Sequence, residues 1–159
     1  MADSLDKQVE QLLQEGKSKG AIYTRLAGPD NRAKLVFSLN NKSLLLRRKE
    51  NMWINIFLAA ALLGMTLKRL LAISVTGNFD FYLVFDFIVP TINFYVLREI
   101  LLFQRTGYQF LAVLTGLALF HTENRMFPDL LINLGMIALA AFLYYRMFPK
   151  DEILSLKKD

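Results

Sequence analysis

Long apolar segments dominate the chain after residue 52, and they constrain its fold more than any other feature of the sequence. Four segments stand out, at about residues 53–75, 79–97, 108–121 and 127–148, with charged or turn-forming residues between them. A helix needs about 20 predominantly apolar residues to cross the hydrocarbon layer of a bilayer. The pattern predicts an all-α integral membrane protein with a bundle of four transmembrane helices.

The distribution of charge supports this prediction better than the bulk composition does. Apolar residues make up 54% of the chain and charged residues 21%, which a soluble protein could also have. Residues 1–51, however, hold ten of the 19 Lys and Arg residues, and most later charges lie between apolar segments or in the tail. The third segment is 14 residues long, or about 21 Å at helical rise, which is short for a full crossing.

The polar N-terminal residues predict a small soluble module of three short helices. The first helix is expected at residues 3–15 with Gly16 as its C-terminal cap, the second begins at Ser18, and the third follows Pro29. The segment lacks the basic and then apolar layout of a signal peptide, so we expect it in the cytosol. The chain then divides into a module (1–42), a bundle (43–149) and a charged cytosolic tail (150–159).

Basic residues are distributed unevenly between the two sides of this topology. One side would carry both termini together with Lys42, Arg47, Arg48, Lys49, Arg98, Arg105, Arg146, Lys150, Lys157 and Lys158. This excess predicts cytoplasmic termini in a bacterial or archaeal cytoplasmic membrane. Arg47, Arg48 and Lys49 directly precede the first apolar segment, where contact with anionic lipid headgroups is expected.

Charged and amide side chains inside the apolar segments form a predicted intramembrane polar cluster of Lys68, Arg69, Asp80, Asp86 and Asn93. If Gly77 marks a hairpin tip, Lys68 lies nine residues before it and Asp86 nine after, at a similar depth of roughly 13 Å. We therefore expect Lys68 or Arg69 to pair with Asp86, in one chain or between subunits. The pair would act as a clamp between helices or as a site on an ion path.

Small residues recur at the spacing that lets helices approach closely in lipid. These candidate packing residues are Ala60 and Gly64, Ala112 and Gly116, and Gly135 and Ala138. They favour a compact bundle, a homo-oligomer or contact with other membrane subunits.

Motifs for chemistry are missing from the sequence. There is no cysteine, and His121, followed by Glu123, is the single histidine, so a Cys- or His-rich metal site is excluded for one chain. No phosphate-binding glycine loop or nucleophile motif is recognisable, and no aromatic and basic interleaving indicates nucleic-acid binding. We expect no cofactor, no nucleic-acid partner and no enzyme acting alone.

Two functional hypotheses follow. The first is a non-enzymatic membrane protein that self-associates or serves as an accessory or anchoring subunit, with the N-terminal helices as its interaction module. The second is an oligomeric ion channel or ion-coupled transporter that uses the polar site at Lys68 and Asp86.

Overall fold

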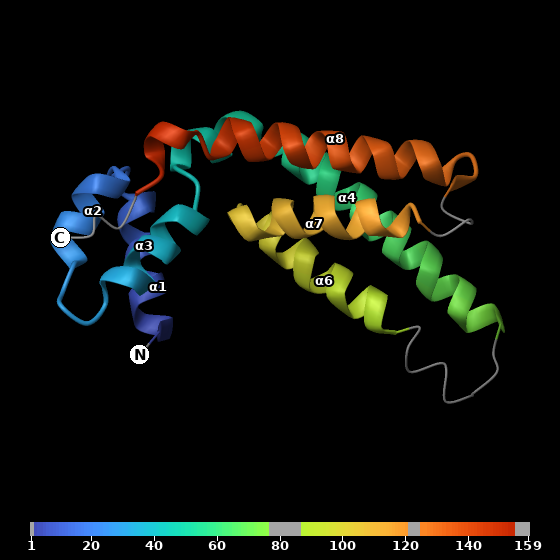
Figure 1. The fold of residues 1–159 in the computed structure, drawn as a ribbon, viewed down its shortest axis with the longest axis horizontal. Helices are drawn as coiled ribbons and strands as arrows, with labels where there is room; N and C mark the ends of the chain where they lie inside the picture. Colours follow the sequence, from blue (N-terminus) through green and yellow to red (C-terminus); the bar gives the residue numbers. More distant parts are fainter. Residues whose placement is uncertain (1, 77–86, 121–124, 155–159) are drawn as a thin grey trace.

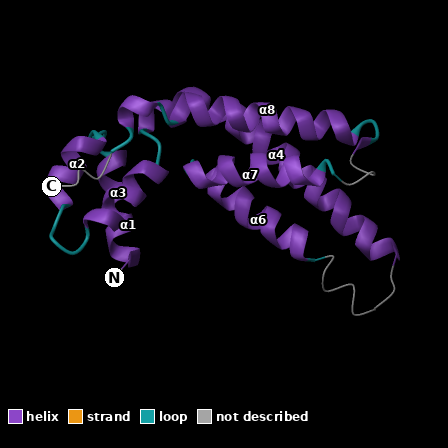
Figure 2. Cartoon of the chain, in the orientation of Figure 1, coloured by secondary structure: helices purple, strands orange, loops and turns teal. Residues whose placement is uncertain are grey.

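A computed structural model of the chain describes residues 2–76, 87–120 and 125–154 (Figure 1). Within these ranges the chain forms helices joined by loops, with no strand, so the predicted all-α class is confirmed (Figure 2). The elements are α1 (Ala2–Gln14), α2 (Lys19–Leu26), α3 (Arg32–Asn41), α4 (Leu45–Thr76), α6 (Ile88–Leu101), α7 (Arg105–Ala118), α8 (Asp129–Met147) and a short 3-10 turn η2 (Lys150–Glu152).

Helices α1 to α3 pack around their own small core. Gly16 follows α1 with a φ of +79°, and its N–H donates to the Leu13 carbonyl, so the predicted glycine cap is confirmed. The Ser18 hydroxyl accepts a hydrogen bond from the Ala21 N–H at 3.3 Å, which starts α2 as predicted. The core of these three helices consists of Val9, Leu12, Leu13, Ile22, Leu35 and Leu39.

The four later helices form a second packed unit. Helix α4 packs against α6 and α8, and α7 packs against the same two helices. Successive helices run in opposite directions, so α4 begins and α8 ends beside α1 to α3 (Figure 1). A buried network helps hold this unit together. The Asn55 amide donates to the Ile100 carbonyl at 3.0 Å, while Tyr108 donates to the Asn55 side-chain oxygen at 2.6 Å.

Two helices are long and apolar enough to cross a membrane, by length and composition. They are α4, over residues Leu45–Val75, and α8. Helices α6 and α7 have 14 residues each, or about 21 Å at helical rise. Helix α4 begins eight residues before the apolar segment predicted at residue 53, and it continues without a break through Lys68 and Arg69.

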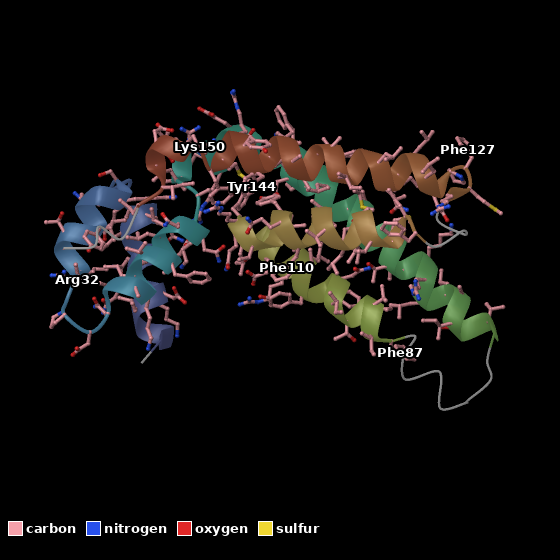
Figure 3. The ribbon with its side chains drawn as sticks, in the orientation of Figure 1. Arg32, Phe87, Phe110, Phe127, Tyr144 and Lys150 are labelled. Atoms are coloured by element: carbon pink, nitrogen blue, oxygen red, sulfur yellow. The ribbon has the colours of Figure 1, made fainter. Side chains whose placement is uncertain are left out.

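The two packed units meet at one end of the bundle. Figure 3 shows Tyr144 at the end of α8 that faces α1 to α3, and Phe127 at the opposite end. Arg105 at the start of α7 donates from Nε to the Tyr144 hydroxyl at 3.0 Å, and its guanidinium lies over the Tyr144 ring. The bundle therefore has a near end, tied to the N-terminal helices, and a far end.

Candidate functional site

A cavity of about 480 Å³ lies between α4, α6, α7 and α8. Three members of the predicted polar cluster, Lys68, Arg69 and Asn93, line it. The rest of its polar lining comes from Thr115 and Asn133. The apolar lining consists of Leu62, Met65, Ala72, Ile73, Val89, Ile92, Val96, Leu111, Leu114, Ala118 and Met136. A volume of this size, mainly apolar with a few polar groups, is typical of sites for small molecules.

Amide and hydroxyl groups set the polarity inside the cavity. Asn93 on α6 donates from Nδ2 to the Thr66 hydroxyl at 3.1 Å, and that hydroxyl donates to the Leu62 carbonyl at 2.7 Å. Asn133 on α8 is 3% exposed, and its Nδ2 has no hydrogen-bond partner among the described residues. Because a buried donor without a partner costs free energy, Asn133 is the polar group among the described lining residues that needs an added acceptor.

Lys68 has a partner that the sequence did not indicate. Its Nζ lies 2.6 Å from both carboxylate oxygens of Asp129, at the beginning of α8. Asp80 and Asp86 lie outside the described residues, so the expected pair of Lys68 or Arg69 with Asp86 stays a prediction. A hairpin at Gly77 predicts contacts only between helices that are adjacent in sequence. In the structure α4 also packs against α8, which lies two apolar segments further along the chain.

Arg69 differs from its neighbour. Its side chain is exposed at the cavity, and no hydrogen bond or ion pair joins its guanidinium to a residue in the described ranges. Lys68 is balanced by Asp129, so the positive charge of Arg69 is the one left uncompensated among the described lining residues.

A second polar region joins the N-terminal helices to the near end of the bundle. Glu10 on α1 accepts hydrogen bonds from Arg48 on α4, at 2.5 and 3.2 Å, and lies 3.4 Å from Lys42. Burial of Glu10 would by itself raise the pKa of its carboxyl group. The hydrogen bond and charge of Arg48, helped by Lys42, hold that pKa below its ordinary value of 4.5.

Further contacts extend this junction. Arg47 donates to Glu152 of η2 at 2.6 and 2.9 Å, and Asn40 exchanges two hydrogen bonds with the backbone of Leu154. Arg47 and Arg48, two of the three predicted headgroup contacts, therefore bind carboxylates of their own chain. The third, Lys49, is exposed and lines an open cleft of about 1260 Å³ between the N-terminal helices and the bundle.

Lys19 is an unexpected buried cation in this junction. It is 4% exposed, its Nζ lies 5.7 Å from the centre of the Phe148 ring, and it has no hydrogen-bond partner in the described ranges. Burial lowers the pKa of its ammonium group from 10.5 to about 8, and the charge of Glu152 offsets part of that shift. Nothing in the local sequence distinguishes Lys19 from the exposed Lys17, so only tertiary packing reveals it.

Most of the predicted helix-packing residues face away from the bundle. Ala60 and Gly64 on α4 are exposed, as are Gly135 and Ala138 on α8, while Ala112 and Gly116 on α7 are half-buried. No side chain or neighbouring helix lies within 4 Å of a Cβ built at Gly64, Gly116 or Gly135. The described part of the chain therefore leaves Ala60, Gly64, Gly135 and Ala138 available, whereas Ala112 packs against the bundle core.

No group of three or more metal-ligating side chains occurs in the ranges that the structure describes, and His121 and Glu123 fall outside those ranges. No protein-family model matches the chain, and comparisons with curated proteins and with solved structures found no significant match.

Proposed function

We propose that this chain is a non-enzymatic integral membrane protein in which α4, α6, α7 and α8 each cross the bilayer. Large apolar side chains along these helices support the proposal, because they are exposed in the isolated chain. Examples are Phe57, Leu71, Phe94, Val113, Leu117, Leu131 and Phe142. Apolar surface of this extent is unfavourable in water and would be covered by lipid or a partner in a membrane.

The charge distribution supports an orientation with the N-terminal helices in the cytoplasm. By their positions along the helices, the residues at the near end are Lys42, Arg47, Arg48, Lys49, Arg98, Arg105, Arg146 and Lys150, whereas those toward the far end are Lys68, Arg69 and Arg125. Cytoplasmic ends of membrane proteins carry the excess of Lys and Arg. The N-terminal helices would then be a cytosolic module held against the bundle by Arg48 and Glu10.

The outward-facing small residues carry the proposal of self-association or of an accessory role. Lipid tails are as apolar as the helices, so no hydrophobic force drives helices together in a membrane. Helices associate there through close backbone approach at Gly and Ala instead. Gly64 and Gly135 lie on exposed faces of the two longest helices, and no neighbouring atom fills the space next to them. A second copy of the chain, or another membrane subunit, would pack there.

The mass of the full-length chain in phosphatidylcholine nanodiscs, with any co-purifying chains identified, tests this proposal. We expect a homo-oligomer or a complex with another membrane chain. Gly64→Leu and Gly135→Leu should reduce the particle to a single chain at unchanged thermal stability, because each site has room for a side chain. Leu71→Ile, on the exposed surface of α4, is the matched control and should leave the assembly intact. A wild-type particle with one chain and no partner would contradict the proposal.

The second candidate function is an oligomeric ion channel or ion-coupled transporter. The cavity favours it, because Lys68, Arg69 and Asn93 line one space between the helices. Ion flux through proteoliposomes is the test, with Asp86→Asn and Lys68→Met as variants. Loss of flux with intact folding would support a transport site. If the wild type carried no flux and the two variants were less stable than it, these residues would act as a clamp between helices.

A further inference from the structure

We propose that the cavity between α4, α6, α7 and α8 binds an amphipathic monoanion, which is a molecule with one acidic head and a hydrocarbon tail. The proposal concerns a ligand inside one chain, so it does not depend on self-association. Three observations on the described residues carry it. They are a buried donor without a partner, a cation without a counter-charge, and the apolar remainder of the lining.

The unpartnered donor is the side-chain amide of Asn133. It lies on the cavity wall, is 3% exposed, and its Nδ2 lacks an acceptor among the described residues. The neighbouring amide of Asn93, in contrast, already donates to Thr66. A ligand oxygen that accepts from Asn133 would satisfy this buried group, so the ligand is expected to be rich in acceptors.

The cation without a counter-charge among the described residues predicts that the ligand is negatively charged. Lys68 and Arg69 line the cavity, and no carboxylate is among its described lining residues. Asp129 binds Lys68, whereas no residue in the described ranges binds the guanidinium of Arg69, so we assign Arg69 as the cationic donor to the ligand. A planar guanidinium matches the two oxygens of a carboxylate or of a phosphate, which makes an oxyanion the preferred head group.

The remainder of the lining determines the body of the ligand. Eleven of the sixteen lining residues are apolar, with Leu62, Val96 and Met136 buried in the bundle core. A hydrocarbon tail is the complement of such a surface. Two sources share this chemistry. One is a free carboxylic acid, and the other is an anionic lipid that enters from the bilayer between the helices.

Equilibrium dialysis against the full-length chain in phosphatidylcholine nanodiscs tests the proposal, with empty nanodiscs as the blank. The probes are hexanoate, hexylammonium and hexanol, which have the same tail and different heads. We expect saturable binding of hexanoate in excess of the blank, and no such excess for hexylammonium. Equal uptake of all three probes, or no excess of hexanoate over the blank, would overturn the proposal.

Variants locate the binding. Arg69→Gln should weaken hexanoate binding about tenfold or more, and Arg69→Lys should restore part of it, because the charge returns without the planar fork. Asn133→Leu should also weaken binding, yet it should unfold at the same temperature as wild type or higher, since it removes a buried group without a partner. Arg125→Gln removes an exposed arginine outside the cavity lining and should bind hexanoate as wild type does.

Nanodiscs that contain phosphatidylglycerol distinguish the two sources. A lower apparent affinity for hexanoate in these nanodiscs would assign the cavity to an anionic lipid that competes for it. An unchanged affinity would assign it to a free acid. Unchanged binding in both Arg69→Gln and Asn133→Leu would mean that hexanoate binds elsewhere, and the proposed site would be wrong.

Discussion

Lys68 of α4 and Asp129 of α8 form an ion pair in which the lysine Nζ lies 2.6 Å from both carboxylate oxygens. The two residues are 61 positions apart in sequence, and they join helices at the far end of the bundle. The lysine side chain is 61% exposed and the aspartate 18% exposed. The pair therefore lies at the edge of the bundle, beside the cavity that Lys68 lines.

A double-mutant cycle measures the energy of this pair. Lys68→Met and Asp129→Asn should each lower the free energy of unfolding, and the double variant should lose less than the sum of the two. We expect a coupling of about 1 kcal/mol, since the lysine is largely exposed. Thermal unfolding in detergent gives the values. The same cycle with Asp86→Asn measures any separate coupling to that residue, and a coupling near zero between Lys68 and Asp129 would contradict the pair seen here.

Gly107 permits a close approach between the beginning of α7 and the end of α6. A Cβ at this position would lie 2.8 Å from the Ile100 nitrogen and 2.9 Å from the Glu99 carbonyl carbon, which are backbone atoms that cannot rotate away. Gly107→Ala should therefore lower the free energy of unfolding by about 1–3 kcal/mol. Gly116→Ala, on the same helix with no neighbouring atom within 4 Å, should be neutral or slightly stabilising. Equal effects of the two variants in thermal unfolding would contradict the close approach.

Glu10 makes the junction sensitive to acid. The pKa of its carboxyl group is held below 4.5, so its contribution to stability is present above the ordinary pKa and is lost as the pH falls through the lowered one. Glu10→Gln should lower the unfolding midpoint at neutral pH, and its difference from wild type should shrink below about pH 4. Glu15→Gln, an exposed residue just after α1, is the matched control and should follow the wild-type profile. If the unfolding midpoints of Glu10→Gln and wild type differed by the same amount at every pH, the Glu10 carboxylate would not be the origin of the acid sensitivity.

Local signals in the sequence were enough for the helices of the N-terminal module. Gly16 and Ser18 mark the end of α1 and the beginning of α2 through their own backbone and side-chain chemistry, which needs no tertiary contact. The start of α4 was missed by eight residues, because the apolar signal begins only at Trp53. The polar first turns of α4 are supported instead by partners distant in sequence, such as Glu10 for Arg48.

The candidate site was predictable in part. Lys68, Arg69 and Asn93 were selected as charged or amide residues in apolar segments, and they line one cavity. Their partners were not predictable, because the Lys68 pair depends on how α8 packs against α4. Asn133 matters because its buried Nδ2 has no hydrogen-bond acceptor among the described residues. The sequence alone does not show which buried donors lack a partner.

Lys19 provides the last prediction, since burial lowers the pKa of its ammonium group to about 8. The unfolded chain therefore binds this proton more tightly than the folded one, and stability rises with pH between about 8 and 10.5. Lys19→Met removes the buried charge and keeps most of the side-chain volume, so it should raise the unfolding midpoint at neutral pH. The difference in unfolding midpoint between Lys19→Met and wild type should become smaller as the pH rises above 8, because wild-type Lys19 then loses its charge. Lys17→Met, at an exposed neighbouring position, should show no such dependence. A variant less stable than wild type at every pH would mean that attraction to Glu152 and the Phe148 ring outweighs the cost of burial.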